Sequence, residues 1–171
     1  MLGEFKIDLL SGYADMIVGI KGKVLLLAIL GAIANISSSR ADVAKNLNSK
    51  LVVEVDGFAN QSGQVCASLF ANSQGFPNNR QKVVQRQCTK IASVPTTITF
   101  NNLKAGSYAV AAIHDRNGDG TLNRNDLGMP IEGYGFSRNP TTEAAPPKFK
   151  DAVVLVAGPS TYVQVQLKYL R

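Results

Sequence analysis

The chain has 171 residues and 45% of them are hydrophobic, which suits one domain with a proper core and a short appendage. Its net charge of +6 comes from scattered residues rather than basic runs, a pattern typical of a soluble surface and not of a nucleic-acid-binding protein. One histidine and two cysteines make a poor zinc set, and no Gly-x-Ser-x-Gly elbow of a hydrolase occurs.

The amino-terminal region has the features of an export signal. An apolar run at residues 24–34 follows Lys21 and Lys23 and ends in small residues spaced for cleavage. We therefore expect a signal peptide over residues 1–34, with Met16 as an alternative start. The run is shorter than the ~20 residues that cross a bilayer, so no permanent membrane span is expected after cleavage. An exported protein, periplasmic or extracellular, follows from this prediction.

Residues 35–49 are rich in Ser, Asn and Ala and lack a core-forming pattern, which predicts a flexible leader. A folded domain is expected over residues 50–171. Its first strand alternates apolar and polar side chains at residues 51–56, and a second strand follows a Gln-Ser-Gly turn at residues 65–70. The two are predicted to form a hairpin or to be neighbours in a Greek key.

The rest of the domain also has the pattern of strands. Polar residues 82–90 indicate an edge strand, residues 96–100 are β-branched, and the apolar residues 108–114 suit the centre of a sheet. Tyr108, after a Gly-containing turn, is either the tyrosine corner of a β-sandwich or an ordinary strand aromatic. Two further strands surround a Gly-Pro turn near the carboxyl terminus. An all-β antiparallel β-sandwich of about seven strands is predicted.

Cys66 and Cys88 are the two cysteines of the chain. In an oxidising compartment they are expected to form a disulfide, which would close a loop of about 23 residues and stabilise the fold by about 3 kcal/mol. The alternative is a pair of buried thiols that act as small apolar residues.

A stretch of twelve residues after the central strand has the spacing of an EF-hand calcium loop. Oxygen-bearing groups occupy its first, third, fifth, seventh, ninth and twelfth positions, and Gly120 takes the sixth, where a sharp turn is needed. The predicted ligands of Ca²⁺ are Asp115, Asn117, Asp119, Thr121 through its carbonyl, Asn123 and Asp126.

The same stretch has a simpler interpretation, in which Asn117-Gly118 and Asp119-Gly120 are turns whose side chains bond their own backbone. Asp126 is also shorter than the glutamate that usually closes such a loop, and two arginines oppose the acids. We therefore expect a weak site, with a dissociation constant on the order of 10⁻⁴ M.

A stretch from residue 128 to 137, too rich in glycine for a helix, is expected to form a long irregular loop together with residues 138–147, and such loops often carry function. Tyr134 and Phe136, with Phe76, are candidates to stack on a sugar or a peptide, and Glu132 is a candidate to add an oxygen to the metal. The alternative is that the two aromatics plug the open end of the sandwich. His114, the single histidine, is expected to be structural rather than catalytic.

Four motifs of the domain match a known family: Leu103-x-x-Gly106-x-Tyr108-Ala109, His114-Asp115-x-Asn117-x-Asp119-Gly120-x-Leu122, Gly128-x-Pro130-x-Glu132-Gly133-Tyr134-Gly135-Phe136-Ser137 and Pro147-x-Phe149. On these residues the domain resembles the exported bacterial proteins of the domain of unknown function 2141 family. The resemblance implies an immunoglobulin-like or prealbumin-like sandwich outside the cytoplasm and no known activity. Where that family often has Asn then Lys in the loop, this chain has Asp119 and Gly120, which suit calcium better. The short acidic loop also resembles those of calcium-stiffened adhesin repeats.

These observations predict a non-catalytic domain that acts as a structural or interaction module. Its expected partner is another exported protein or a glycan. A carbohydrate- or small-ligand-binding module that uses the 128–137 loop is the alternative. The sequence does not indicate an oligomeric state.

Overall fold

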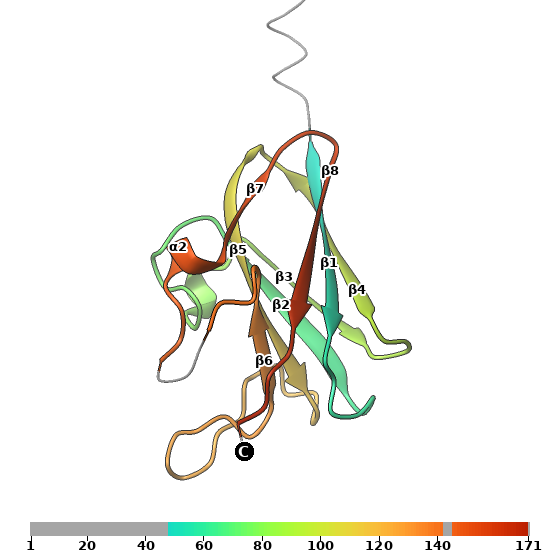
Figure 1. The fold of residues 1–171 in the computed structure, drawn as a ribbon, viewed down its shortest axis with the longest axis vertical. Coiled ribbons are helices and arrows are strands. Elements are labelled where there is room, and N and C mark those ends of the chain that lie inside the picture. The colour runs from blue at the N-terminus through green and yellow to red at the C-terminus, as the bar shows by residue number, and fades with distance from the viewer. Residues whose placement is uncertain (1–47, 142–144, 171) are drawn as a thin grey trace, which may run out of the picture. The chain divides into compact units, whose positions relative to one another are not determined.

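Eight strands, one short α-helix and one 3-10 turn make up the computed structural model, which describes residues 48–141 and 145–170 (Figure 1). The expected signal peptide and almost all of the expected leader lie outside these residues. The elements are β1 Ser49–Asp56, β2 Gln64–Phe70, η1 Arg80–Lys82, β3 Gln85–Lys90, β4 Thr96–Leu103, β5 Gly106–Asp115, β6 Gly133–Phe136, α2 Phe149–Ala152, β7 Val153–Val156 and β8 Ser160–Gln166.

The strands form two sheets, with the orders β4-β1-β8 and β3-β2-β5-β6. β7 pairs with the first half of β5, and β6 pairs with its second half. The predicted β-sandwich is therefore confirmed, with β5 central and β3 at an edge. One pair, β1 with β8, runs parallel because the chain changes sheet between β7 and β8.

Two sequence-based expectations were wrong, one about strand pairing and one about an irregular segment. β1 and β2 do not pair, because the connection between them crosses from one sheet to the other. β6, expected to be irregular because of its glycines, is a strand paired to β5. An added Cβ at Gly133 would lie 2.4 Å from the Tyr169 ring, and one at Gly135 would lie 2.7 Å from the Gln166 carbonyl oxygen. These glycines let the carboxyl-terminal segment pack against the strand.

Apolar side chains from both sheets meet in the main core, and the predicted alternation of β1 is confirmed. Leu51, Val53 and Val55 are fully buried in this core. The Tyr108 hydroxyl donates a hydrogen bond to the Lys104 carbonyl oxygen at 3.0 Å, four residues upstream. That contact is the tyrosine corner, and it fixes the turn between β4 and β5.

The outer face of the β3-β2-β5-β6 sheet carries a second, smaller apolar cluster. Phe76, which lies before η1, contributes to it, and so do residues of α2. Phe76 stacks edge-on against Phe70, Phe136 and Phe149, with ring centroids 5.3–5.9 Å apart.

Cys66 of β2 faces Cys88 of β3, with Cα atoms 4.0 Å apart, and the two form the predicted disulfide. No helix among the described residues has the length and apolar character needed to cross a membrane.

Candidate functional site

The loop that leaves β5 is held by the carboxylate of Asp115, which is fully buried. Its Oδ1 accepts a hydrogen bond from the backbone N–H of Gly118, and its Oδ2 accepts one from that of Gly120, each at 2.8 Å. The side-chain amide of Gln64 donates a further bond to Oδ2 at 2.7 Å. These bonds satisfy a buried charge and coil the chain tightly around it.

Four more of the predicted ligand residues converge on one another. The side-chain amides of Asn117 and Asn123 lie 2.9 and 3.0 Å from Oδ2 of Asp119, and Thr121 donates two bonds to Oδ1. These bonds, the one from the Thr121 hydroxyl foremost, hold the pKa of Asp119 well below its usual range. The structure therefore brings Asn117, Asp119, Thr121 and Asn123 together beside Asp115.

Asp126 does not join this group of contacts. It is exposed at the tip of a short hairpin, where Asn125 accepts a bond from Gly128. The coil is closed instead by Glu132, which is 2% exposed. Its two carboxylate oxygens accept the backbone N–H groups of Arg116 at 2.8 Å and Asn123 at 2.9 Å. Glu132 thereby ties the first turn of the loop to its end.

The donor set gives a mixed fit to a metal ion. Over residues 48–141 and 145–170, no three acidic, histidine or cysteine side chains are grouped as a metal centre would need. Oδ1 of Asn123, however, is buried and has no hydrogen-bond partner. A half-turn of that amide would place an oxygen next to the Asp119 carboxylate. Amide and carboxylate oxygens suit a hard cation such as Ca²⁺.

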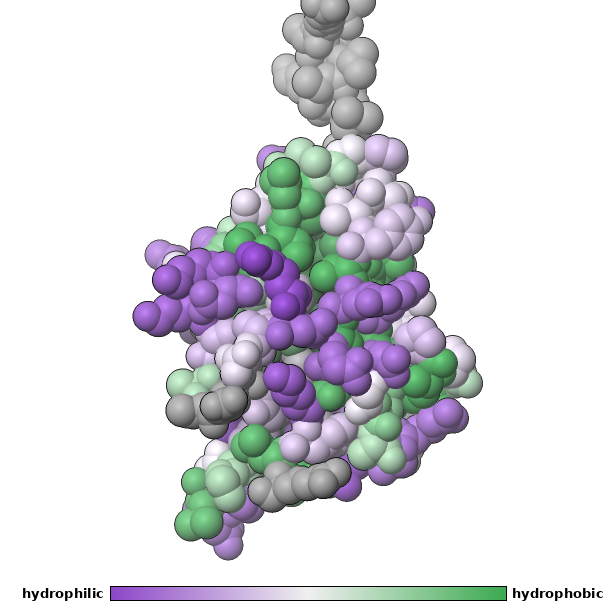
Figure 2. All heavy atoms as spheres, in the orientation of Figure 1, coloured by the Kyte–Doolittle hydropathy of each residue, from purple (hydrophilic) through white to green (hydrophobic). Residues whose placement is uncertain are grey.

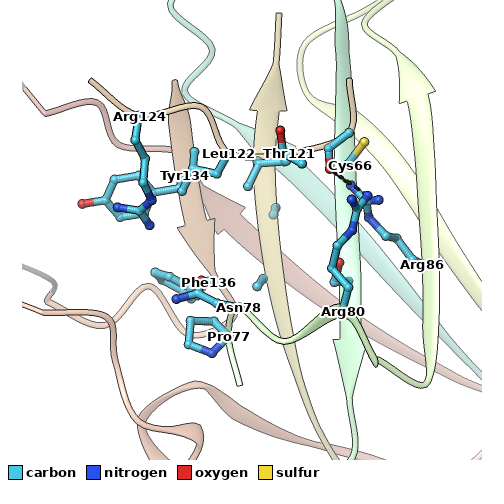
Figure 3. A pocket seen from close by; sticks show the side chains of 15 residues that line it. Cys66, Pro77, Asn78, Arg80, Arg86, Thr121, Leu122, Arg124, Tyr134 and Phe136 are labelled. Atoms are coloured by element: carbon cyan, nitrogen blue, oxygen red, sulfur yellow. Dashed lines mark hydrogen bonds between the residues drawn. The ribbon is translucent and has the colours of Figure 1, made fainter. Parts of the chain in front are cut away.

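The same loop forms one wall of a groove on the outer face of the β3-β2-β5-β6 sheet (Figure 3). Two contiguous cavities of about 290 and 300 Å³ make up the groove and share five residues: Asn78, Leu122, Arg124, Tyr134 and Phe136. Ser68 and Ala111, both small, lie along the sheet beneath it.

Two arginines line one side of this groove. Arg80 donates a hydrogen bond to the Gly120 carbonyl oxygen at 3.0 Å, and Arg86 donates to the same oxygen. Among the described residues neither arginine forms an ion pair. Partial burial, followed by the charge of Arg80, lowers the pKa of Arg86, while Asp115 acts in the opposite direction. The local field is thus positive.

Aromatic rings line the opposite side of the groove (Figure 3). Tyr134 and Phe136 point outward from β6 and stack edge-on, with ring centroids 6.0 Å apart. Phe136 also packs against Phe76, which lies in the adjacent apolar cluster. The two aromatics therefore cover the outer face of the sheet and do not plug the open end of the sandwich, since it is Gly133 and Gly135 that face inward.

His114 has a satisfied, buried position on the inner face. Its Nε2 lies 2.8 Å from the Ser62 carbonyl oxygen and its Nδ1 lies 2.6 Å from the Tyr169 hydroxyl. Since a carbonyl oxygen only accepts, Nε2 carries the proton and the hydroxyl donates to Nδ1. Burial is the main reason that the pKa of Tyr169 is raised. Both ring nitrogens of His114 are therefore engaged within the fold.

The arginines of the groove were not among the candidates drawn from the sequence. Arg86 lies on the edge strand β3, where a basic residue is expected simply to discourage unwanted pairing. Arg80 and Arg86 lie 40 and 34 residues from Gly120 along the chain. No local pattern joins residues so far apart, so only the folded chain shows that they meet.

Comparison with known proteins gave one informative match. The search of curated proteins found no significant match, and the search of solved structures found none. A family model described as "Uncharacterized protein conserved in bacteria (DUF2141)" matches residues 53–164, from β1 to β8. The chain therefore belongs to the DUF2141 family of bacterial proteins.

Proposed function

We propose that the protein is an exported, non-catalytic binding module whose ligand site is the groove between the 115–123 loop, the two arginines and β6. The single observation that carries this proposal is the groove itself, with the rings of Tyr134 and Phe136, beside Arg124, on one side and Arg80 and Arg86 on the other. Small-ligand sites are concave, largely apolar and furnished with a few placed polar groups, which is the arrangement here.

Two features support the exported and non-catalytic parts of the proposal. The disulfide between Cys66 and Cys88 suits an oxidising compartment. A general base has to offer a nitrogen or oxygen to the substrate, and both nitrogens of His114 are engaged with Ser62 and Tyr169.

A glycan array probed with the mature domain tests the binding function. We expect binding that is lost in Tyr134→Ala and retained in Tyr162→Ala. Tyr162 is a matched control because it is 70% exposed on β8, in the other sheet. An array with no signal above background would refute the proposal, and so would binding that survives Tyr134→Ala.

Calcium binding by the 115–126 loop is a second candidate function, favoured by the unpartnered Oδ1 of Asn123 beside Asp119. Asp115, Asn117, Asp119 and Asn123 would supply side-chain oxygens and Thr121 its carbonyl, with Glu132 in place of the exposed Asp126. The bound ion would stiffen the wall of the groove.

Thermal unfolding in calcium and in chelator tests this second function. With a dissociation constant on the order of 10⁻⁴ M, 10 mM calcium would stabilise the domain by about 2.7 kcal/mol. The gain should shrink in Asn123→Ala, which keeps the backbone bond to Glu132, and persist in Asn101→Ala, an exposed asparagine of β4. An unchanged midpoint would remove calcium from the function.

A further inference from the structure

We infer that the ligand of the groove is a carboxylated saccharide, with its carboxylate at Arg80 and Arg86 and its ring against Tyr134. This inference rests on the proposed binding function and adds the chemical class of the ligand. Neither arginine belongs to any motif of the sequence.

The pairing of Arg80 with Arg86 is the first step of the argument. Two guanidinium groups converge on one carbonyl oxygen, that of Gly120, and a Cβ built at Gly120 would lie 3.1 and 3.4 Å from them. Like charges held together raise the free energy of the protein, and here Arg86 is half-buried while Arg80 is exposed. An anion bound at this corner would relieve the repulsion between them.

The Asp115 carboxylate does not remove this positive charge. It acts on Arg86 more weakly than burial and Arg80 do. Its oxygens are also already engaged with Gly118, Gly120 and Gln64. A ligand carboxylate would meet the planar N–H donors that both guanidinium groups still carry beyond their bond to Gly120.

The opposite wall selects the rest of the ligand. Tyr134 is half-buried and offers both a ring face and a hydroxyl, a combination that suits the mixed apolar and polar faces of a sugar. Ser68 adds a hydroxyl along the sheet beneath the groove. A cavity of about 290 Å³ has room for a short saccharide rather than an extended polymer.

The ligand class is tested by calorimetric titration with digalacturonate and with its methyl ester, which has nearly the same size but no charge. We expect the acid to bind at least tenfold more tightly than the ester, because charge-assisted hydrogen bonds to arginine are the stronger kind. We also expect the affinity for the acid to fall as salt is raised. Equal affinity for acid and ester would overturn the inference while leaving the binding function standing.

Inorganic phosphate serves as a second probe. Displacement of digalacturonate by millimolar phosphate would show an anion site without a sugar preference and would overturn the saccharide part. The variant Arg86→Gln should reduce the affinity for the acid about tenfold and leave the ester unaffected. Lys104→Gln, which removes an exposed charge from the β4–β5 turn, should change neither. Because the acid and ester are compared on the unaltered protein, the test stands even if Arg86→Gln folds poorly.

Discussion

Replacing Glu132 by glutamine tests how the 115–123 loop is closed. Both carboxylate oxygens of Glu132 accept backbone N–H groups, at 2.8 and 2.9 Å, and the side chain is 2% exposed. Glutamine keeps one acceptor, and it turns its NH₂ group toward the other N–H. One charge-assisted hydrogen bond is then lost and the other becomes neutral.

The expected cost follows from these two bonds. A hydrogen bond to a charged group contributes about 1.5–3 kcal/mol and a neutral one about 1 kcal/mol. Arg116 is exposed, so water can replace part of what its N–H loses. We therefore expect Glu132→Gln to lower the free energy of unfolding by about 2–3 kcal/mol. The melting temperature of a domain of this size would fall by roughly 10 °C.

Differential scanning calorimetry, backed by urea unfolding, measures this change. Asp126→Asn is the matched control, since it removes the same kind of charge from the exposed tip of the neighbouring hairpin. It should alter stability by less than about 0.5 kcal/mol. If Glu132→Gln melts with the unaltered protein, or if Asp126→Asn is equally costly, the assignment of loop closure to Glu132 is wrong.

Three further outcomes are expected. Reducing the Cys66–Cys88 disulfide, which spans a sequence separation of 22, should cost about 3 kcal/mol in urea unfolding, and a double Cys→Ala variant should lose its response to reductant. Gly133→Ala should destabilise the domain by about 1–3 kcal/mol because the added Cβ would clash with Tyr169. Gly106→Ala is the control, since its Cβ would lie 3.7 Å from the nearest atom, and it should destabilise the domain far less in the same melts. Equal effects of the two substitutions would contradict the packing argument. The folded-state pKa of Asp119 is depressed, so the contribution of Asp119 to stability is complete above its unfolded pKa of about 4 and is lost as the pH falls through the folded value. Melts between pH 5 and pH 2 should therefore show a loss of stability that Asp119→Asn lacks. Identical profiles of the two proteins would count against this role of Asp119.

The hairpin at residues 124–130 illustrates how local patterns mislead. The twelve-residue spacing predicted that Asp126 closes the loop that Asp115 opens. In the fold the chain turns outward after Asn123, with backbone bonds from Ile131 to Asn123 and from Asn125 to Met129. Apolar residues then gather on this exposed loop, at the lower end of Figure 2, where Leu127 is 81% exposed. Spacing along the chain is therefore a poor guide to distance once a hairpin intervenes.

The strands other than β6, the buried face of β1 and the disulfide partners were readable from the sequence. The tyrosine corner and the coil around Asp115 were each one of two interpretations that the sequence left open. Each of these depends on alternation, on composition or on contacts between near neighbours, and such local regularities are written in consecutive residues.

Sheet membership, the closure by Glu132 and the meeting of Arg80 and Arg86 at Gly120 were decided only by the tertiary structure. The contact between Arg116 and Glu132 joins residues 16 positions apart, and the contacts of Arg80 and Arg86 with Gly120 span 40 and 34 positions. Many pairings of strands bury the same apolar faces, so the local pattern does not choose among them. The choice is made when the two sheets pack, because a single arrangement then has to satisfy every buried polar group together.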